Sequence, residues 1–168
     1  MHLKIDGLTF DIDLERTMIH RAKEADNPCD CAYCRNFSAA IDGAYPNLRP
    51  FLAQFGVDIT LPDESMPYDQ PSEMWYENVY SVSGRILSGD ETTMEIDGTE
   101  VHFHNENLHQ INASCPRPRF FITVGMMRLP WVLDEPMADV ISPANDPSFL
   151  RKMWTRLLVK CGKSKIKS

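Results

Sequence analysis

The sequence predicts an α+β fold in which N-terminal helices and a C-terminal helix pack on a mainly antiparallel β-sheet. Apolar residues recur at helical spacing in residues 11–56, alternate with polar residues in residues 73–132, and return to helical spacing in residues 147–161. The chain has 168 residues, of which 43% are hydrophobic and 24% charged, as in globular proteins. We therefore expect one domain, residues 1–162, followed by a mobile basic tail, residues 163–168.

The helical part is predicted to follow a hairpin over residues 3–12, because Asp6-Gly7 is typical of a tight turn. A first helix is predicted from an aspartate cap to about residue 26, with one buried face made of Leu14, Met18, Ala22 and Ala25. A second is expected from residues 32–34 to about 43, with Phe37, Ala40 and Ile41 buried. A third is expected over residues 46–55, where Pro50 kinks or shortens it.

The β-rich part is predicted to begin after residues 58–72, an irregular connection that contains three prolines. The strand from Met74 is expected to place Tyr80, Val82, Gly84 and Ile86 on one face. Asp97-Gly98 predicts a second hairpin, and the apolar residues 120–128 predict a central strand. The last helix, residues 147–161, has one apolar face: Phe149, Leu150, Met153, Trp154, Leu157, Leu158 and Cys161.

The net charge of −7 is unevenly distributed. All 24 acidic side chains precede residue 147, whereas seven of the 17 lysines and arginines follow it. The acidic body argues against a general nucleic-acid surface, so only the basic C-terminal stretch is expected to contact an anionic partner. Neither a signal peptide nor a transmembrane segment is expected, which favours a cytoplasmic protein with reduced thiols.

Three of the five cysteines, Cys29, Cys31 and Cys34, fall within six residues. Thiolates are soft anionic ligands, and the C-x-C-x2-C spacing can bring three of them around one tetrahedral zinc ion. The fourth ligand would come from elsewhere in the chain. The candidates are His20, Cys115 or a histidine of residues 102–109, such as His104.

Two other interpretations of the cluster remain open. Cys31 and Cys34 would form a redox dithiol if Cys31 begins a helix, since a helix N-terminus stabilises a thiolate and Arg35 adds positive charge. The context differs from that of a thioredoxin-type motif, because a helix and Pro28 precede the cluster. Alternatively, the three residues are reduced cysteines packed where helices meet.

Other residues suggest weaker candidate sites. His102 and His104 share one strand face, as a metal pair or as part of a solvated surface. The aromatic residues Trp75, Tyr76, Tyr80 and Trp131 indicate either a ligand pocket or ordinary packing. Asp134-Glu135 resembles a catalytic carboxylate pair but lacks a base or nucleophile beside it. The C-terminal helix is typical of a membrane-surface or partner-binding helix, or of a helix docked on its own sheet.

Two segments, CDCAYCRNF at residues 29–37 and LPWVLDEP at residues 129–136, together resemble a set of small bacterial proteins. The strand from Trp75 to Gly84 and the FGVD segment at residues 55–58 are similar in kind. The resemblance covers about residues 1–136. It implies a bacterial, cytoplasmic, single-domain protein, and it brings no activity or functional residues with it.

These features predict a binding or interaction protein for an unknown protein or small-molecule partner, with a metal or thiol site at the cysteine cluster and zinc as its expected cofactor. The alternative is a zinc- or thiol-dependent enzyme whose site lies between the cysteine loop and the His102–His109 strand. We favour binding over catalysis, because the sequence contains no complete set of catalytic residues.

Overall fold

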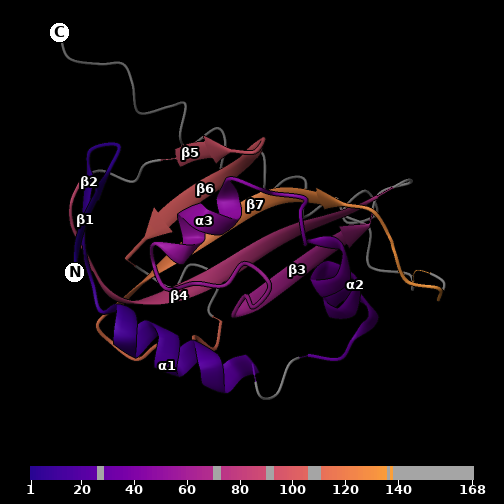
Figure 1. The fold of residues 1–168 in the computed structure, drawn as a ribbon, viewed down its shortest axis with the longest axis horizontal. Helices are drawn as coiled ribbons and strands as arrows, with labels where there is room; N and C mark the ends of the chain where they lie inside the picture. The colour runs from indigo at the N-terminus through magenta and orange to yellow at the C-terminus, as the bar shows by residue number, and fades with distance from the viewer. Residues whose placement is uncertain (26–28, 70–72, 90–92, 106–110, 136, 138–168) are drawn as a thin grey trace, which may run out of the picture.

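The computed structural model describes residues 1–25, 29–69, 73–89, 93–105, 111–135 and 137. Within them, a seven-stranded antiparallel sheet follows the order β1-β2-β4-β7-β6-β5, with β3 also paired to β4 (Figure 1). The strands are β1 His2–Ile5, β2 Leu8–Ile12, β3 Glu64–Asp69, β4 Met74–Ser88, β5 Thr93–Ile96, β6 Thr99–His104 and β7 Arg119–Leu129. The helices are α1 Leu14–Ala25, α2 Ala32–Ala40 and α3 Leu48–Ala53. The α+β class and the antiparallel sheet are confirmed.

Strand β4 organises the sheet because it is 15 residues long and has a neighbour on each side. On one side it pairs with β7 from Met74 to Ser83. On the other side β3 covers its first half and β2 its second half, up to the pairing of Thr9 with Ser88. The predicted central position of residues 120–128 is confirmed, since β7 lies between β4 and β6.

Strand β3 corrects the prediction that residues 58–72 are irregular throughout. Six residues of this proline-rich segment pair with β4, from Glu64 opposite Val79 to Asp69 opposite Met74. Pro67 is tolerated because β3 is an edge strand, where a missing N–H leaves no gap in an inner ladder. The strand forms by pairing with β4, the next strand in the chain, and local sequence periodicity does not reveal it.

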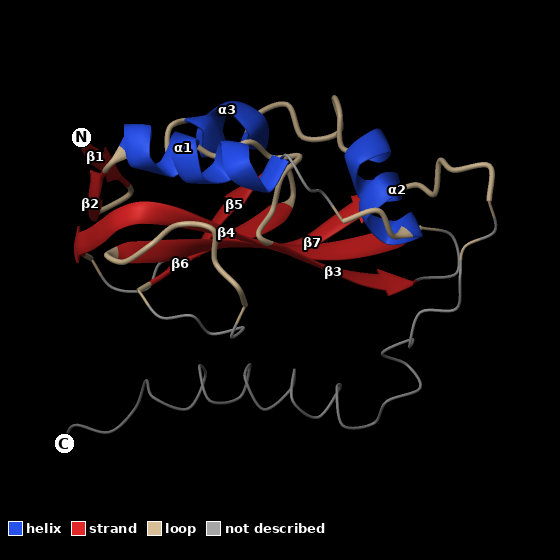
Figure 2. Ribbon diagram, turned by 90° about the horizontal axis from the view of Figure 1, so that it is seen from below, coloured by secondary structure: helices blue, strands red, loops and turns tan. Residues whose placement is uncertain are grey.

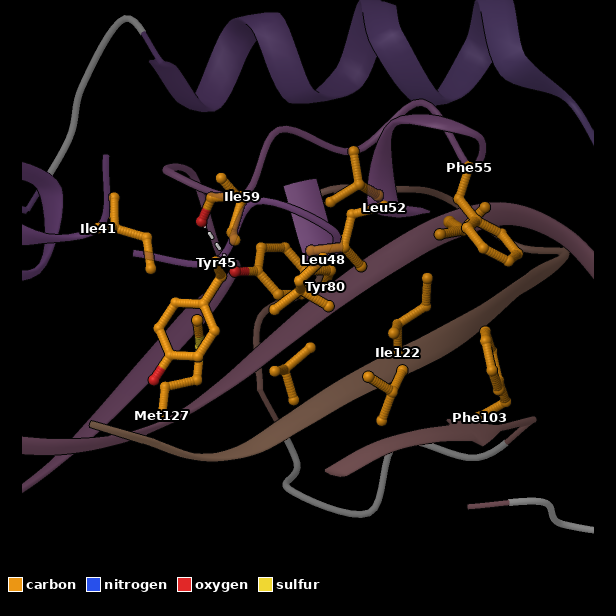
Figure 3. Close-up of a cluster of buried hydrophobic side chains, with 14 of the residues drawn as sticks. Ile41, Tyr45, Leu48, Leu52, Phe55, Ile59, Tyr80, Phe103, Ile122 and Met127 are labelled. Carbon is orange, nitrogen blue, oxygen red and sulfur yellow. Dashed lines mark hydrogen bonds between the residues drawn. The ribbon is translucent and has the colours of Figure 1, made fainter. Parts of the chain in front are cut away.

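All three helices lie on one face of the sheet (Figure 2). Beneath them, buried side chains from α3 and from strands β2, β4, β6 and β7 form the hydrophobic core (Figure 3). Aromatic rings connect its parts: the Phe55 ring centroid lies 5.3 Å from that of Phe10 and 5.5 Å from that of Phe103. The buried Tyr80 hydroxyl donates a hydrogen bond to the Ile59 carbonyl at 2.8 Å.

Helix α1 forms where predicted, and Leu14 packs against the core as expected, but the predicted buried face is wrong at Met18 and Ala22. Met18 is 60% exposed and Ala22 is exposed, whereas the fully buried positions are Thr17 and Arg21. The Thr17 hydroxyl accepts a hydrogen bond from the Ser83 N–H at 3.0 Å, and Arg21 pairs with buried Asp63. Besides the apolar contact of Leu14, the helix therefore docks through polar contacts, because Ser83 of β4 and Asp63 just before β3 face it at these positions.

Helix α3 is shorter than the predicted 46–55 helix, and Pro50 lies in its first turn, where a backbone N–H has no partner within the helix. The predicted helix 147–161 and tail 163–168 lie outside the described residues. In the described part of the chain, no helix has the length and apolar character needed to cross a membrane.

Candidate metal centre

The cysteine cluster lies at the start of α2. Cys31 is the N-cap residue, with extended backbone angles of φ −71° and ψ 154°, and its carbonyl accepts a hydrogen bond from the Arg35 N–H at 3.0 Å. Cys34 follows in the first turn of the helix, so the turn folds its side chain back toward the N-cap. Cys29 approaches from the preceding connection. The local chain path therefore brings the three side chains to one corner.

The sulfur atoms of Cys29, Cys31 and Cys34 all lie within 4.8 Å of one another. Three thiolates bound to one tetrahedral zinc ion are about 3.8 Å apart, given Zn–S bonds of about 2.3 Å. A side-chain adjustment of about 1 Å would close the remaining difference. Cys29 and Cys31 are exposed, Cys34 is half-buried, and all three are free thiols. The donor set therefore fits a thiophilic ion that can reach it from solvent.

The three thiols affect one another's ionisation. Burial raises the pKa of Cys31, but hydrogen bonds from the Cys34 N–H and from the side chains of Cys29 and Cys34 lower it by more, so its net pKa is lowered. Burial raises the pKa of Cys34, and hydrogen bonding and charge repulsion from the other two thiols raise it further. In the metal-free cluster Cys31 therefore loses its proton more readily than Cys34, and a bound cation would displace the protons that remain.

The Arg35 guanidinium links the cysteine loop to the chain after β7. Its Nη1 donates to the carbonyl oxygen of Asp30, the residue between the first two cysteines, and lies 3.5 Å from the Asp30 carboxylate. Its Nη2 forms an ion pair with Glu135. Figure 1 shows the chain after β7 (orange) running beside α2.

Residues 130–135 also contact α2 through Asn36, which is fully buried. The Asn36 side chain accepts a hydrogen bond from the Val132 N–H at 2.7 Å and donates to the Pro130 carbonyl at 3.1 Å. Its amide also donates to the Tyr76 hydroxyl at 3.0 Å. The first of the two segments that the sequence singled out, residues 29–37, therefore contacts the described part of the second, residues 129–135.

The other predicted ligands do not join this group of sulfur atoms. The group contains neither His20, His104 nor Cys115. Cys115 is buried, and its thiol donates to the Ser81 carbonyl at 3.4 Å. His109 lies outside the described residues.

The predicted histidine pair shares one face of β6, with ring centroids 6.1 Å apart. His102 Nδ1 lies 2.9 Å from the Thr93 hydroxyl and Nε2 lies 3.1 Å from the Glu100 carboxylate. Between them, Phe103 points into the core beneath the helices, so the histidines lie on the opposite face of the sheet from α2.

For the four aromatic residues the sequence left a ligand pocket and ordinary packing open, and the structure gives each of them packing contacts. Tyr76 and Tyr80 are buried in the core. Trp75 donates to the Glu73 carboxylate at 2.7 Å and stacks with Arg128, while Trp131 packs edge-on against Tyr33. Of the predicted carboxylate pair, Glu135 is engaged by Arg35.

Sequence reasoning missed a buried polar network around Asp63. Its carboxylate accepts hydrogen bonds from the backbone N–H groups of Ser81 and Ser114, each at 2.5 Å, and pairs with Arg21 Nη1 at 2.6 Å. The fully buried Asp63 side chain thus connects α1, β4 and the segment before β7. Asp63 lies in the proline-rich segment and no local pattern marks it, whereas Arg21 sits at helical spacing from Thr17.

Comparisons with protein-family models, with curated proteins and with solved structures gave no match to this chain.

Proposed function

We propose that this chain is a metal-binding protein in which Cys29, Cys31 and Cys34 bind one thiophilic ion, with zinc as the expected metal. The observation that carries the proposal is the mutual approach of three free sulfur atoms within 4.8 Å. Zinc accepts thiolate ligands readily and has no geometric preference of its own, so three convergent thiolates suit it.

The position of the cluster supports a binding role rather than a role in holding the fold together. None of the three cysteines belongs to the hydrophobic core, and two of them are exposed. Small domains that need a structural metal lack a core of their own, whereas this chain buries a large one. A metal here would be accessible to exchange and to partner molecules.

The alternative enzyme site, between the cysteine loop and the His102–His109 strand, receives less support. His102 and His104 lie on the opposite face of the sheet from α2, as the burial of Phe103 beneath the helices indicates. The sheet therefore separates the two groups of side chains that such an enzyme would have to combine.

The test is the zinc content of tag-free protein purified under reducing conditions, measured by native mass spectrometry. We expect one zinc ion per chain in the wild type and loss of zinc in Cys31→Ser and Cys34→Ser. Cys115→Ser is the matched control, because it removes a cysteine outside the group. Zinc-free wild-type protein that stays metal-free after incubation with zinc would contradict the proposal, as would equal loss in the control.

A second candidate function is thiol–disulfide exchange by Cys31 and Cys34. The observation that favours it is the position of Cys31 at the N-cap with the Cys34 sulfur within reach. The Cys31 thiolate would attack one sulfur of a substrate disulfide and displace the other as a thiolate. Cys34 would then lose its proton and attack Cys31, which releases the second substrate thiol and leaves a Cys31–Cys34 disulfide.

Trapping separates this candidate from simple metal binding. With glutathione disulfide as the substrate, Cys34→Ser should accumulate a mixed disulfide on Cys31, because the resolving thiol is missing. Cys31→Ser should not form one at Cys34. Equal labelling of the two variants would exclude the exchange reaction.

A further inference from the structure

The Arg35 side chain bridges the two parts of the chain that carry the three thiols. Arg35 follows Cys34 on α2, so its backbone is fixed relative to the third ligand. Its guanidinium holds the carbonyl of Asp30, which lies between Cys29 and Cys31. Because Asp30 lies between Cys29 and Cys31, a shift of its carbonyl would move the backbone of both cysteines. The Arg35 contact therefore restrains the distance of these two cysteines from Cys34.

Glu135 holds the other end of the same guanidinium and belongs to a segment that is itself fixed against α2. The Glu135 carbonyl accepts a hydrogen bond from the Trp131 ring N–H at 2.8 Å. The Trp131 ring centroid lies 6.0 Å from that of Tyr33, and Val132 is held by Asn36. These contacts hold residues 130–135 against α2, and the ion pair of Glu135 with Arg35 connects this segment to the cysteine loop.

We propose that the Arg35–Glu135 pair couples metal occupancy of the thiol site to residues 130–135. This inference rests on the proposed function. Arg35 and Glu135 act as positioning residues: they touch no metal, and they hold the loop that carries two ligands. Partners that orient metal ligands typically contribute 10- to 100-fold to metal affinity.

The coupling is reciprocal. If contact with residues 130–135 raises zinc affinity by some factor, bound zinc stabilises that contact by the same factor. Bound zinc would then also stabilise the position of residues 130–135, where Val132 is 46% exposed.

The exposure of the ion pair makes this proposal separable from a general effect on stability. The Arg35 and Glu135 side chains are 40% and 43% exposed, and exposed pairs contribute little to folding. Removing the pair should therefore lower zinc affinity while leaving the unfolding midpoint of metal-free protein unchanged.

The experiment measures zinc affinity by competition with a chromophoric chelator in Arg35→Gln, Glu135→Ala and the double variant. Two matched controls remove similar charges elsewhere. Arg49→Gln removes an arginine of similar exposure that pairs with Asp42, and Asp134→Ala removes the exposed carboxylate next to Glu135. We expect both test variants to bind zinc at least tenfold more weakly, the double variant to be no weaker than Arg35→Gln, and the controls to bind like the wild type.

Hydrogen exchange supplies the second readout. Zinc should slow exchange at the backbone amides of residues 131–135 in the wild type and in Asp134→Ala, but not in Glu135→Ala. Test variants that bind zinc within twofold of the controls would overturn the proposal, and so would a fall in the metal-free unfolding midpoint large enough to account for the lost affinity. Failure of the wild type itself to bind zinc would instead refute the proposed function.

Discussion

At the residue scale, the cysteine spacing predicted which three thiols approach one another. It did not predict the contacts of Arg35 with Asp30 and Glu135 that hold the cysteine loop in place. Cys29, Cys31 and Cys34 are close in sequence, so a connection that ends at a helix N-cap brings them together locally. Arg35 and Glu135 are a hundred residues apart, and their pairing depends on how β7 is placed beside α2. Local sequence patterns cannot supply such a contact, although the resemblance at residues 29–37 and 129–136 marked both segments.

The buried pair of Arg21 and Asp63 yields a prediction at this scale. Asp63→Asn should lower the free energy of unfolding by about 3–5 kcal/mol, because a buried guanidinium loses its counter-charge. The change also replaces one carboxylate oxygen with an amide nitrogen, which donates hydrogen bonds and cannot accept them. Urea unfolding followed by circular dichroism measures the difference.

Asp42→Asn is the control for this prediction, since it disrupts the pair with Arg49 at a site that is 87% exposed. It should change the free energy of unfolding by less than about 1 kcal/mol. An Asp63→Asn variant as stable as Asp42→Asn would show that the buried network contributes nothing net to folding.

At the element scale, periodicity identified most of the helices and strands but did not describe their packing. Alternation in β4 placed Tyr80 and Val82 on one face, and the structure buries both of them in the core. The same reasoning failed for the middle of α1, because it ranked Met18 above Thr17 by hydrophobicity. The partners that face this part of the helix are the Ser83 N–H of β4 and the Asp63 carboxylate just before β3. The buried face of the helix is determined by the chemistry of the residues that pack against it, and those residues lie far away in sequence.

Helix α3 depends on a cap supplied by another element. The Asp97 carboxylate, in the turn between β5 and β6, accepts hydrogen bonds from the backbone N–H groups of Asn47 and Leu48 at 2.8 and 2.9 Å. Desolvation raises the pKa of Asp97, but these bonds and one from the Asn47 side chain lower it by more, to below its ordinary value of 3.8. The contact therefore joins the β5–β6 hairpin to the start of α3 more strongly when the carboxylate is ionised than when it is protonated.

This cap predicts a pH dependence with a definite sign. Because the folded-state pKa of Asp97 is lowered, its stabilising contribution is present above the ordinary pKa and is lost as the pH falls through the folded-state value. Wild type should therefore unfold at a higher temperature than Asp97→Asn at pH 6, and the gap should shrink as the pH falls below 3.8.

Asparagine is the suitable substitution at position 97, because the backbone there has a φ of +52° that asparagine tolerates. Scanning calorimetry across this pH range measures the gap. A gap that stays constant with pH would mean that the charge on Asp97 does not contribute to the cap.

At the scale of the whole molecule, the proposed metal site lies outside the core. The core includes side chains of β2, α2, α3, β4, β6 and β7, and α2 contributes Phe37, but Cys29, Cys31 and Cys34 are not part of it. The sequence predicted a core of this kind from its length and composition, but the order of the strands could not be read from it. That order results from long-range pairing of β2 and β7 with β4.

This separation predicts that the fold survives metal removal. Protein treated with a strong zinc chelator, and the triple variant with serine at positions 29, 31 and 34, should keep the far-ultraviolet circular dichroism spectrum and cooperative unfolding of the untreated protein. Bound zinc should raise the unfolding temperature only through mass action, so the rise should depend on zinc concentration. Loss of structure on chelation would instead identify the metal as a folding element.

The central claim, that three specific thiolates bind one thiophilic ion, is tested most directly by X-ray absorption spectroscopy at the zinc edge on protein loaded with one equivalent of zinc. We expect three sulfur atoms in the first coordination shell at about 2.3 Å, and fewer sulfur atoms for Cys31→Ser but not for Cys115→Ser. A shell containing only nitrogen and oxygen, or a sulfur count that Cys31→Ser leaves unchanged, would contradict the claim.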